Sequence, residues 1–443
     1  MITELKLVNW KSYAQTSLYI DPLSVLVGTN ASGKSNALDA LLFLNRVASG
    51  TMLTSALQGD SAKSPLRGGV EWVARRPGNI FSVGVICRSD DFTDYEYVLE
   101  GHVSEGRCDL HSEQLTRIKY RVGRDGQRKS SVGTIKLMRT DTCIEDSTTI
   151  IARLYNEKQG TPRQLSRTNS VLFQLDGQKL RQEIHDGINA VISKLRNIFI
   201  LDPIPSHMRN YSPLADKLDP DAKNIAGVLA ALPDEKKQEI ENVLTTYVSQ
   251  LPERDIQRVY AETVGKFNSD AMLYCEEHLS DDGDPPTVDA RGMSDGTLRF
   301  LAILTALLTR PPASLLVIEE VDNGLHPSRA KLLLEMLRKE GGRRGVDVLV
   351  TTHNPALLDA MGTEMIAFIT VAHRDQTTGH SMLTLLEDLE QLPKLLAQGS
   401  VGHLSSQGLI ERSLSPNGAK RPLKTPPAND QQGRLFQETT LNG

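Results

Sequence analysis

Eight residues near the amino terminus have the types and spacing needed to hold a polyphosphate. The segment Gly28-Thr29-Asn30-Ala31-Ser32-Gly33-Lys34-Ser35, followed by Asn36, matches the pattern G-x-x-x-x-G-K-[ST]. The two glycines permit a backbone curl that turns N–H groups toward a phosphate, and a helix starting near Lys34 adds its partial positive charge. Lys34 can reach the β- and γ-phosphates, and the Ser35 hydroxyl can ligate Mg²⁺. The alternative is a chance glycine-rich turn, but the apolar strand pattern before the segment and the helix pattern after it favour a nucleotide site.

Two acidic residues follow an apolar run much later in the chain. Residues 315–318 (LLVI) are typical of a buried strand, and Glu319 and Glu320 come directly after them. In an open α/β sheet, ligands bind at the carboxyl ends of the strands. Glu319 is therefore a candidate for holding Mg²⁺, and Glu320 for orienting or deprotonating an attacking water. Two acids at a strand end also fit a solvated terminus, and the phosphate-binding pattern upstream favours the functional interpretation.

Two further segments could contact a phosphate. Residues 293–297 (MSDGT) open an apolar helix, in which Ser294 suits the capping position and Gly296 allows close approach of the backbone. By itself this segment is simply a capped helix. His353 follows the strand pattern of residues 348–352 and can donate to a γ-phosphate, although an ordinary loop histidine would give the same pattern.

The elements that must position these residues alternate between strand and helix. Strands are predicted at 2–8, 18–20, 23–27, 314–318, 346–351 and 364–371, and helices at 36–47, 297–309, 328–339 and 355–360. Strands that alternate with helices predict a parallel, doubly wound α/β sheet.

The middle of the chain follows a different pattern. A strand pair is predicted at 80–87 and 95–99, a polar β-leaning stretch at 115–155, and helices at 180–199, 224–232, 235–250 and 254–267. From about residue 413 the sequence is rich in Pro, Asn and Gln and is predicted to be disordered. We therefore expect an amino-terminal half at 1–90, an insertion at 91–285 that is first mixed β and then α-helical, a carboxyl-terminal half at 286–400, and a tail at 413–443.

Composition excludes several classes of protein. The 443 residues carry a net charge of −5 and 39% apolar residues, so the chain is an ordinary globular protein and no polycation. The four cysteines are far apart, which argues against zinc ligation and a disulfide framework and fits a reduced cytoplasmic setting; they are Cys87, Cys108, Cys143 and Cys275. No apolar run approaches about 18 residues, so no membrane span is expected.

A basic cluster interrupts the β-leaning stretch of the insertion. It contains Arg117, Lys119, Arg121, Arg124, Arg128 and Lys129, with Tyr120 among them. Such a cluster could contact the phosphate backbone of DNA, and it also fits a solvated hairpin. DNA therefore stays a candidate partner.

Taken together, the four chemical segments occur in the order found in ABC-class ATPases, and the sequence resembles that class. More narrowly, it is similar to the RecF/SMC-related bacterial ATPases in three places: Lys11-Ser12-Tyr13, Ser32 to Asn36, and the run EEVDNGLHP from Glu319 to Pro327. The resemblance covers roughly residues 1–100 and 285–390. It implies an α/β P-loop NTPase with an ABC-type head, whose mostly parallel sheet carries an antiparallel β part and an α-rich insertion.

The resemblance assigns a role to each motif. Gly28 to Ser35 match Walker A, and Ser294 with Gly296 match a shortened signature motif, which in this class touches the γ-phosphate bound to the other protomer. Glu319 matches the Walker B metal acid, where Asp is more usual. Glu320 matches the catalytic glutamate, His353 the switch histidine, and Asn323 to His326 the D-loop. No glutamine could be assigned to the Q-loop.

These roles imply a homodimer that binds ATP and Mg²⁺ and hydrolyses ATP. The sequence lacks the acidic pattern of the Toprim nuclease carried by relatives of the overcoming-lysogenization-defect type, a His-Asn-His cluster, and the arms of an SMC protein. Our first hypothesis is an ATPase that controls a separately encoded effector, such as a nuclease or toxin, in defence against phage. The alternatives are a RecF-like DNA-binding ATPase in repair and a scaffold in which ATP is structural. The expected docking surface consists of the Pro-rich loop from Asp202 to Pro213, with Arg209 in it, and the helices after Asn224.

Overall fold

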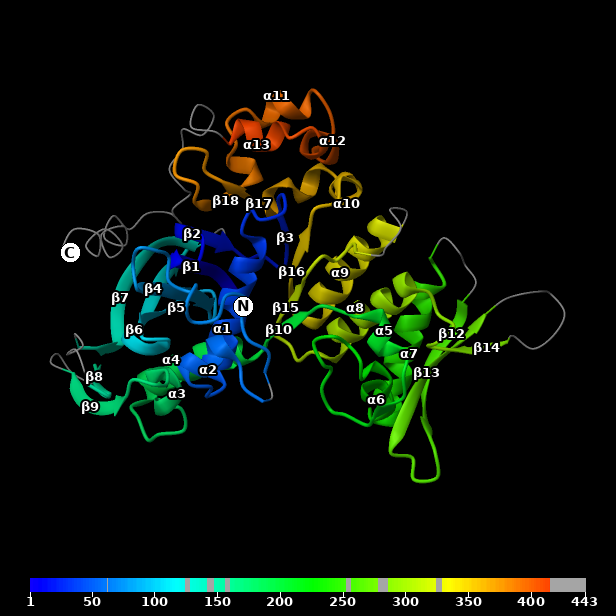
Figure 1. Cartoon of the computed structure of the whole chain (residues 1–443), viewed down its shortest axis with the longest axis horizontal. Helices are drawn as coiled ribbons and strands as arrows, with labels where there is room; N and C mark the ends of the chain where they lie inside the picture. Colours follow the sequence, from blue (N-terminus) through cyan, green and yellow to red (C-terminus); the bar gives the residue numbers. More distant parts are fainter. Residues whose placement is uncertain are drawn as a thin grey trace.

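The computed structural model describes residues 1–61, 63–123, 128–141, 147–155, 160–251, 256–277, 286–323 and 329–414. In Figure 1 one large sheet extends from the blue and cyan strands to the strands near the centre, and a separate green portion lies to the right. The tail predicted to be disordered lies outside the described residues from position 415 onward.

The centre of the large sheet is parallel. Its strands lie in the order β10 (Ile198–Leu201), β15 (Leu315–Ile318), β16 (Asp347–Thr352), β3 (Leu23–Val27) and β17 (Ile369–Arg374). Each of these strands pairs in parallel with its neighbour, although their order in the sheet is not their order in the chain. The predicted doubly wound α/β core is therefore confirmed, and all these strands point their carboxyl ends to one edge.

Alternate residues of each central strand pack into two different cores. Leu316 and Ile318 of β15 lie in a cluster with α8 (Asp295–Thr309) and α9 (Ala330–Arg344). Leu315 and Val317 lie in the other cluster, with α1 (Lys34–Ala48) and α4 (Gln182–Arg196). Because helices cover both faces, these strands appear in the sequence as continuous apolar runs and not as alternating ones.

The same sheet continues as a mostly antiparallel half, which begins with one parallel pair. Its strands, in sheet order, are β18 (Ser381–Leu385), β2 (Tyr13–Tyr19), β1 (Ile2–Trp10), β4 (Ile80–Arg88), β5 (Thr93–Ser104), β6 (Arg107–Val122), β7 (Arg128–Thr140), β8 (Thr149–Leu154) and β9 (Thr161–Ser166). The helices α2 (Leu53–Gln58) and α3 (Val171–Leu175) contribute to the core on this side, and α4 packs across β5, β6 and β7.

A smaller sheet belongs to the separate portion seen in Figure 1. It consists of β11 (Ser212–Pro213), β12 (Ile256–Val264), β13 (Asp270–Glu277) and β14 (Thr287–Asp289), and the nearby helices are α5 (Pro205–Met208), α6 (Ile225–Ala230) and α7 (Asp234–Val248). The helix predicted at 254–267 is wrong, because residues 256–264 form β12. Ile256, Val259 and Tyr260 have helix-like spacing, but a bulge after Ile256 shifts the strand register and lets Ile256 and Val259 both be buried.

Two predicted boundaries also need correction. The helix predicted at 180–199 ends at Arg196, and β10 begins at Ile198 in pairing with β15. The strand predicted at 364–371 begins only at Ile369, where pairing with β3 begins, and the residues before it form the 3₁₀ helix η2 (Thr363–Phe368). Long-range pairing decides both boundaries, so local periodicity could not supply them.

The remaining elements follow the central strands at the carboxyl-terminal end of the described chain. They are α10 (Pro355–Ala360), η3 (Leu386–Asp388), α11 (Leu392–Leu396), α12 (Val401–Ser406) and α13 (Leu409–Ser413). Within the described ranges, no helix combines the length and apolarity needed to cross a bilayer.

Candidate nucleotide-binding site

The loop between β3 and α1 has the backbone that its glycines predict. Gly28 has a φ of 149°, and Gly33, which precedes the first residue of α1, has a φ of 115°. A Cβ at Gly28 would lie 2.2 Å from the Ala372 carbonyl oxygen, and one at Gly33 would lie 2.7 Å from Ser381 Oγ. No larger residue fits either position without moving β17 or β18, so both glycines are required by geometry.

The amino-terminal hairpin holds this loop in place. Tyr13 Oη donates to the Gly33 carbonyl at 2.9 Å, and Asn36 Nδ2 donates to Ser12 Oγ at 2.7 Å. Lys11 Nζ donates to Asp39 Oδ2 of α1 at 2.5 Å. Every residue of the Lys11-Ser12-Tyr13 motif therefore contacts the start of α1, and the Asn36 side chain is committed to Ser12.

Lys34 lies at the amino terminus of α1 with its ammonium group folded over the loop. Lys34 Nζ donates to the carbonyl oxygens of Gly28 at 2.5 Å and Thr29 at 3.1 Å. Burial lowers the pKa of Lys34, while the nearby charges of Glu320 and Glu319 act to raise it. Residues 29–31 are exposed, and the buried Ser32 hydroxyl has no hydrogen-bond partner within the described structure. An orphaned hydroxyl beside a cation and exposed backbone suits an anionic ligand.

Ser35 and Glu319 meet although they are 284 positions apart in the chain. Ser35 Oγ donates to Glu319 Oε1 at 2.7 Å, which brings the start of α1 to the carboxyl end of β15. Mg²⁺ prefers hard oxygen ligands such as a hydroxyl and a carboxylate, so these two residues fit the ion. The described residues contain no group of three or more His, Cys, Asp or Glu side chains arranged to hold a metal.

Arg67 is a residue of the site that sequence analysis missed. Its guanidinium donates to both carboxylate oxygens of Glu319, at 2.9 and 3.1 Å, and to Asp39 Oδ1 at 3.3 Å. Burial would raise the pKa of Glu319, but the hydrogen bonds from Arg67 and Ser35 outweigh it and hold the pKa below its usual value. Arg67 therefore holds the Glu319 carboxylate in place and competes for its oxygens with any cation that binds there.

Glu320 has a strained backbone conformation. Its φ is 49°, in the left-handed region that residues other than Gly, Asn and Asp rarely adopt. Thr351 at the end of β16 fixes this conformation, because Thr351 Oγ1 accepts from the Glu320 N–H at 2.8 Å and the Thr351 carbonyl accepts from the Val321 N–H at 3.0 Å. Asn323 Nδ2 donates to Glu320 Oε2 at 3.4 Å. The rest of the predicted D-loop, residues 324–326, lies outside the described part of the chain.

Two more polar residues extend this edge of the sheet. His353 follows β16, whose Thr352 pairs with Val27 of β3, so His353 and Gly28 leave adjacent strands. Asp202 follows β10, whose Leu201 pairs with Ile318, so Asp202 stands beside Glu319. Burial, and then the charge of Glu319, raises the pKa of Asp202. Asp202 thus occupies the strand-end position next to Glu319, a position that no sequence motif marked.

The predicted signature segment lies at the start of α8. Ser294 caps the helix by accepting from the Thr297 N–H at 3.1 Å, and Gly296 is buried. Among the described residues, no hydrogen bond or ion pair joins positions 293–297 to positions 28–36. One chain therefore brings residues 28–36, which we call the phosphate loop, to the same edge of the sheet as Glu319, Glu320 and His353. Ser294 and Gly296 stay outside this network.

Two of the six basic residues of the insertion cluster form ion pairs within the chain, and Lys119 and Arg121 are exposed. Arg117 pairs with Glu183 at 3.3 Å, and Arg128 pairs with Asp94 at 2.7 Å while lying over the Tyr120 ring. Arg124 and the Lys129 side chain lie outside the described residues. The ion pairs favour the structural interpretation of Arg117 and Arg128 over a free phosphate-binding surface.

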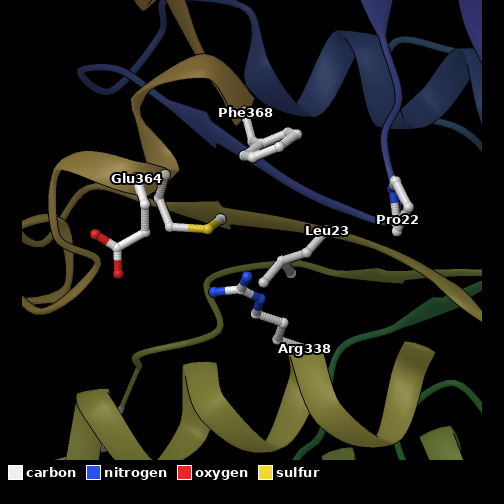
Figure 2. Close-up of a pocket in the computed structure, with 6 residues that line it drawn as sticks. Pro22, Leu23, Arg338, Glu364 and Phe368 are labelled. Carbon is white, nitrogen blue, oxygen red and sulfur yellow. The ribbon is translucent and has the colours of Figure 1, made fainter. Parts of the chain in front are cut away.

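A cavity of about 220 Å³ lies away from the phosphate loop, at the amino-terminal end of β3. Pro22, Leu23, Met365 and Phe368 supply its apolar lining, and Figure 2 shows Arg338 reaching from α9 toward Leu23. Because nucleotides bind at the carboxyl ends of the strands in such sheets, this cavity is not part of the candidate site.

Two family models match the sequence. The model described as "AAA domain, putative AbiEii toxin, Type IV TA system" matches residues 136–359, just over half of the chain. The model described as an AAA ATPase domain matches residues 1–70. The second range contains the phosphate loop and Arg67, and the first contains Ser294, Glu319, Glu320 and His353. No curated protein matches the sequence.

Solved structures with a similar arrangement include SMC head domains. A head bound to the C-winged helix domain of ScpA is 14% identical with a TM-score of 0.46, over 86% of this chain and 96% of that one. The head domain from Thermotoga maritima is 14% identical with a TM-score of 0.37, over 87% and 98%. A head with an extended coiled coil, bound to the carboxyl-terminal domain of ScpA derived from Pyrococcus furiosus, is 13% identical with a TM-score of 0.46, over 90% and 98%.

Proposed function

This chain belongs to the AAA-domain family of the AbiEii type, and from that premise we propose that two copies of it close around two ATP molecules and hydrolyse them. The proposal rests on the observation that the predicted site residues form two separate groups within one chain. Ser35, Glu319 and Glu320 meet at one edge of the sheet, whereas Ser294 and Gly296 stand outside that network. A signature helix that makes no hydrogen bond or ion pair with its own loop at residues 28–36, among the described contacts, can serve the loop of a second copy.

Each residue of the site has a distinct task in this proposal. Lys34 and the N–H groups of residues 29–33 bind the phosphates, and Ser35 and Glu319 hold Mg²⁺, which when bound neutralises charge on the phosphate oxygens. Glu320 accepts a proton from the attacking water, and its strained backbone, fixed by Thr351, keeps the carboxylate at the strand end. His353 donates to the γ-phosphate from the neighbouring strand.

Isolated heterodimers test whether the sites are shared between copies. Two chains with different affinity tags are co-expressed, and the dimers carrying both tags are purified. When one chain carries Ser294→Arg and the other Glu320→Gln, one site is intact, and we expect about half of the wild-type ATPase rate. When one chain carries both substitutions and its partner is wild type, neither site is intact, and we expect almost no hydrolysis.

Equal rates in the two arrangements would refute the shared site. As a control, Glu335→Gln on the exposed face of α9 replaces Glu320→Gln, and both arrangements should then keep one intact site. ATP binding to each single variant, measured by titration calorimetry, shows whether Ser294→Arg has damaged its own phosphate loop instead.

We also propose that the ATPase cycle controls another protein. The family description names a toxin and a toxin–antitoxin system, which supports control of a separately encoded nuclease or toxin, most simply in defence against phage. The insertion between the two halves of the site would change position when two copies close, so we expect it to contact this effector.

Nuclease assays test whether the effector is a separate protein. The purified chain, incubated with DNA or RNA and Mg²⁺ or Mn²⁺, is expected to cleave neither. The acidic residues after His353 that come nearest to a nuclease pattern are Glu387, Asp388 and Glu390. Cleavage that survives stringent purification and is lost on substitution of one of them would mean that the effector is built into this chain. Tight binding of duplex DNA, dependent on ATP, would instead favour the RecF-like alternative.

A further inference from the structure

Arg209 is turned toward the signature segment and not toward solvent. It follows α5, and its Nη1 donates to the carbonyl oxygens of Ala290, Arg291 and Met293 at 3.0, 2.9 and 2.7 Å. Its Nη2 contacts Asp295 Oδ1 at 2.5 Å. One guanidinium therefore holds the last residues before α8 together with the first residue of that helix, although we expected Arg209 to lie on a docking surface.

The contacts hold the backbone before Ser294 and the side chain of the residue after it. Nη1 has two N–H groups for three carbonyl oxygens, so one N–H is shared, while Nη2 holds the carboxylate. A lysine ammonium has a single nitrogen and could keep only part of this set. The Arg209 side chain is 27% exposed, and Asp295 is 69% exposed. The Arg209 side chain is thus largely shielded from solvent, whereas Asp295 is exposed at the amino terminus of α8, where a second copy would approach.

The segment that precedes Arg209 begins at the edge of the sheet where Glu319 lies. Asp202 follows β10 and stands beside Glu319, and only the residues that include α5 separate it from Arg209. α5 packs against α8, so the segment from Asp202 to Arg209 is held at both ends. This segment therefore connects the strand end beside Glu319 to Arg209 and the signature loop.

We infer that Arg209 is a positioning residue, which holds the signature loop of one copy in place for the ATP bound by the other copy. The inference rests on the proposed function. It predicts that loss of Arg209 damages the site of the partner and leaves the site of its own chain intact. A role limited to stabilising the fold would damage the two sites without regard to which chain carries the substitution.

Arg209→Ala tests the inference in the doubly tagged heterodimers. In the homodimer we expect kcat to fall roughly 10- to 100-fold, the scale set by losing a charge-assisted hydrogen bond, with little change in ATP affinity. Paired with a Glu320→Gln chain, the Arg209→Ala chain should regain about half of the wild-type rate, because its own site then uses an intact signature loop. A chain carrying both substitutions, paired with wild type, should keep only about half of the low rate of the Arg209→Ala homodimer.

The controls separate the possible failures. Arg258→Ala removes an exposed arginine of the same portion of the molecule, which pairs with Glu276. Combined with Glu320→Gln, it should give about half of the wild-type rate whether the two substitutions are on one chain or on different chains. If Ser294→Arg gives activity only when Glu320→Gln is on the other chain, while Arg209→Ala does not show this dependence, this inference is wrong and the shared site stands. If Ser294→Arg fails as well, the proposed function fails. Arg209→Lys, which keeps the charge, should give an intermediate kcat; full activity would also overturn the inference, as would a poorly folded Arg209→Ala whose Arg209→Lys counterpart hydrolyses normally.

Discussion

Glu320→Gln is expected to slow ATP hydrolysis by roughly 10²- to 10⁴-fold, the range typical of removing a general base, while ATP still binds. Glutamine keeps the shape of the side chain and can still contact Asn323, but it cannot take a proton from water. The hydrogen bond from the Glu320 N–H to Thr351 Oγ1 involves only backbone on the Glu320 side, so the strained conformation should persist. Single-turnover hydrolysis of radiolabelled ATP measures the chemical step directly.

The matched control for this variant is Glu335→Gln. Glu335 is exposed on α9, pairs with Lys331 within the same helix, and lies outside the site described above. Its substitution should leave the single-turnover rate unchanged. A normal rate for Glu320→Gln would show that Glu320 is not the base, and Asp202 would then be the next carboxylate to examine, because it stands beside Glu319.

Lys34→Ala is expected to weaken ATP binding by roughly 100-fold, as expected for losing hydrogen bonds from a charged group to phosphate. Lys34 Nζ contacts the exposed backbone of residues 29–31 at the Thr29 carbonyl oxygen, 3.1 Å away, and both glutamates at the end of β15 lie close enough to influence its charge. Without Lys34, their negative charge would repel the γ-phosphate. Titration calorimetry with a slowly hydrolysed ATP analogue measures the loss.

A folding control is needed for Lys34→Ala, because Lys34 also donates to the Gly28 and Thr29 carbonyl oxygens. The thermal midpoint without nucleotide should stay close to that of the wild type. Lys331→Ala, which removes an exposed lysine of α9, should bind ATP normally. Unchanged ATP affinity in a well-folded Lys34→Ala variant would contradict the assignment of residues 28–35 as the phosphate-binding loop.

The parts of the fold that local sequence determines were predictable. The apolar run before Gly28, the glycine spacing and the helix pattern after Lys34 all lie within about thirty residues, and they gave β3, the loop and α1. The acids after β15 could be placed at the same edge because parallel strands present their carboxyl ends together. Each of these predictions needs only nearby residues and a general rule of sheet topology.

The rest of the site depends on contacts that no local pattern encodes. Arg67 reaches Glu319 from a position 252 residues away, and it lies in a stretch that showed no periodicity. Asp202 belongs to the site only because β10 pairs with β15, whereas the sequence predicted a helix up to residue 199 and a Pro-rich loop from Asp202 onward. The same reason explains β12, where pairing with β13 prevails over a helix-like spacing of apolar residues.

The most direct test of the account is the mass of the Glu320→Gln variant measured by light scattering, with and without ATP and Mg²⁺. Because hydrolysis is slowed, ATP should hold two copies together, so the mass should shift to twice the 48.8 kDa of one chain, or an existing dimer should dissociate far less on dilution. Adding Ser294→Arg to the same variant should abolish the shift. A protein that stays monomeric at saturating ATP, while the wild type hydrolyses ATP at its full rate as a monomer, would contradict the shared site.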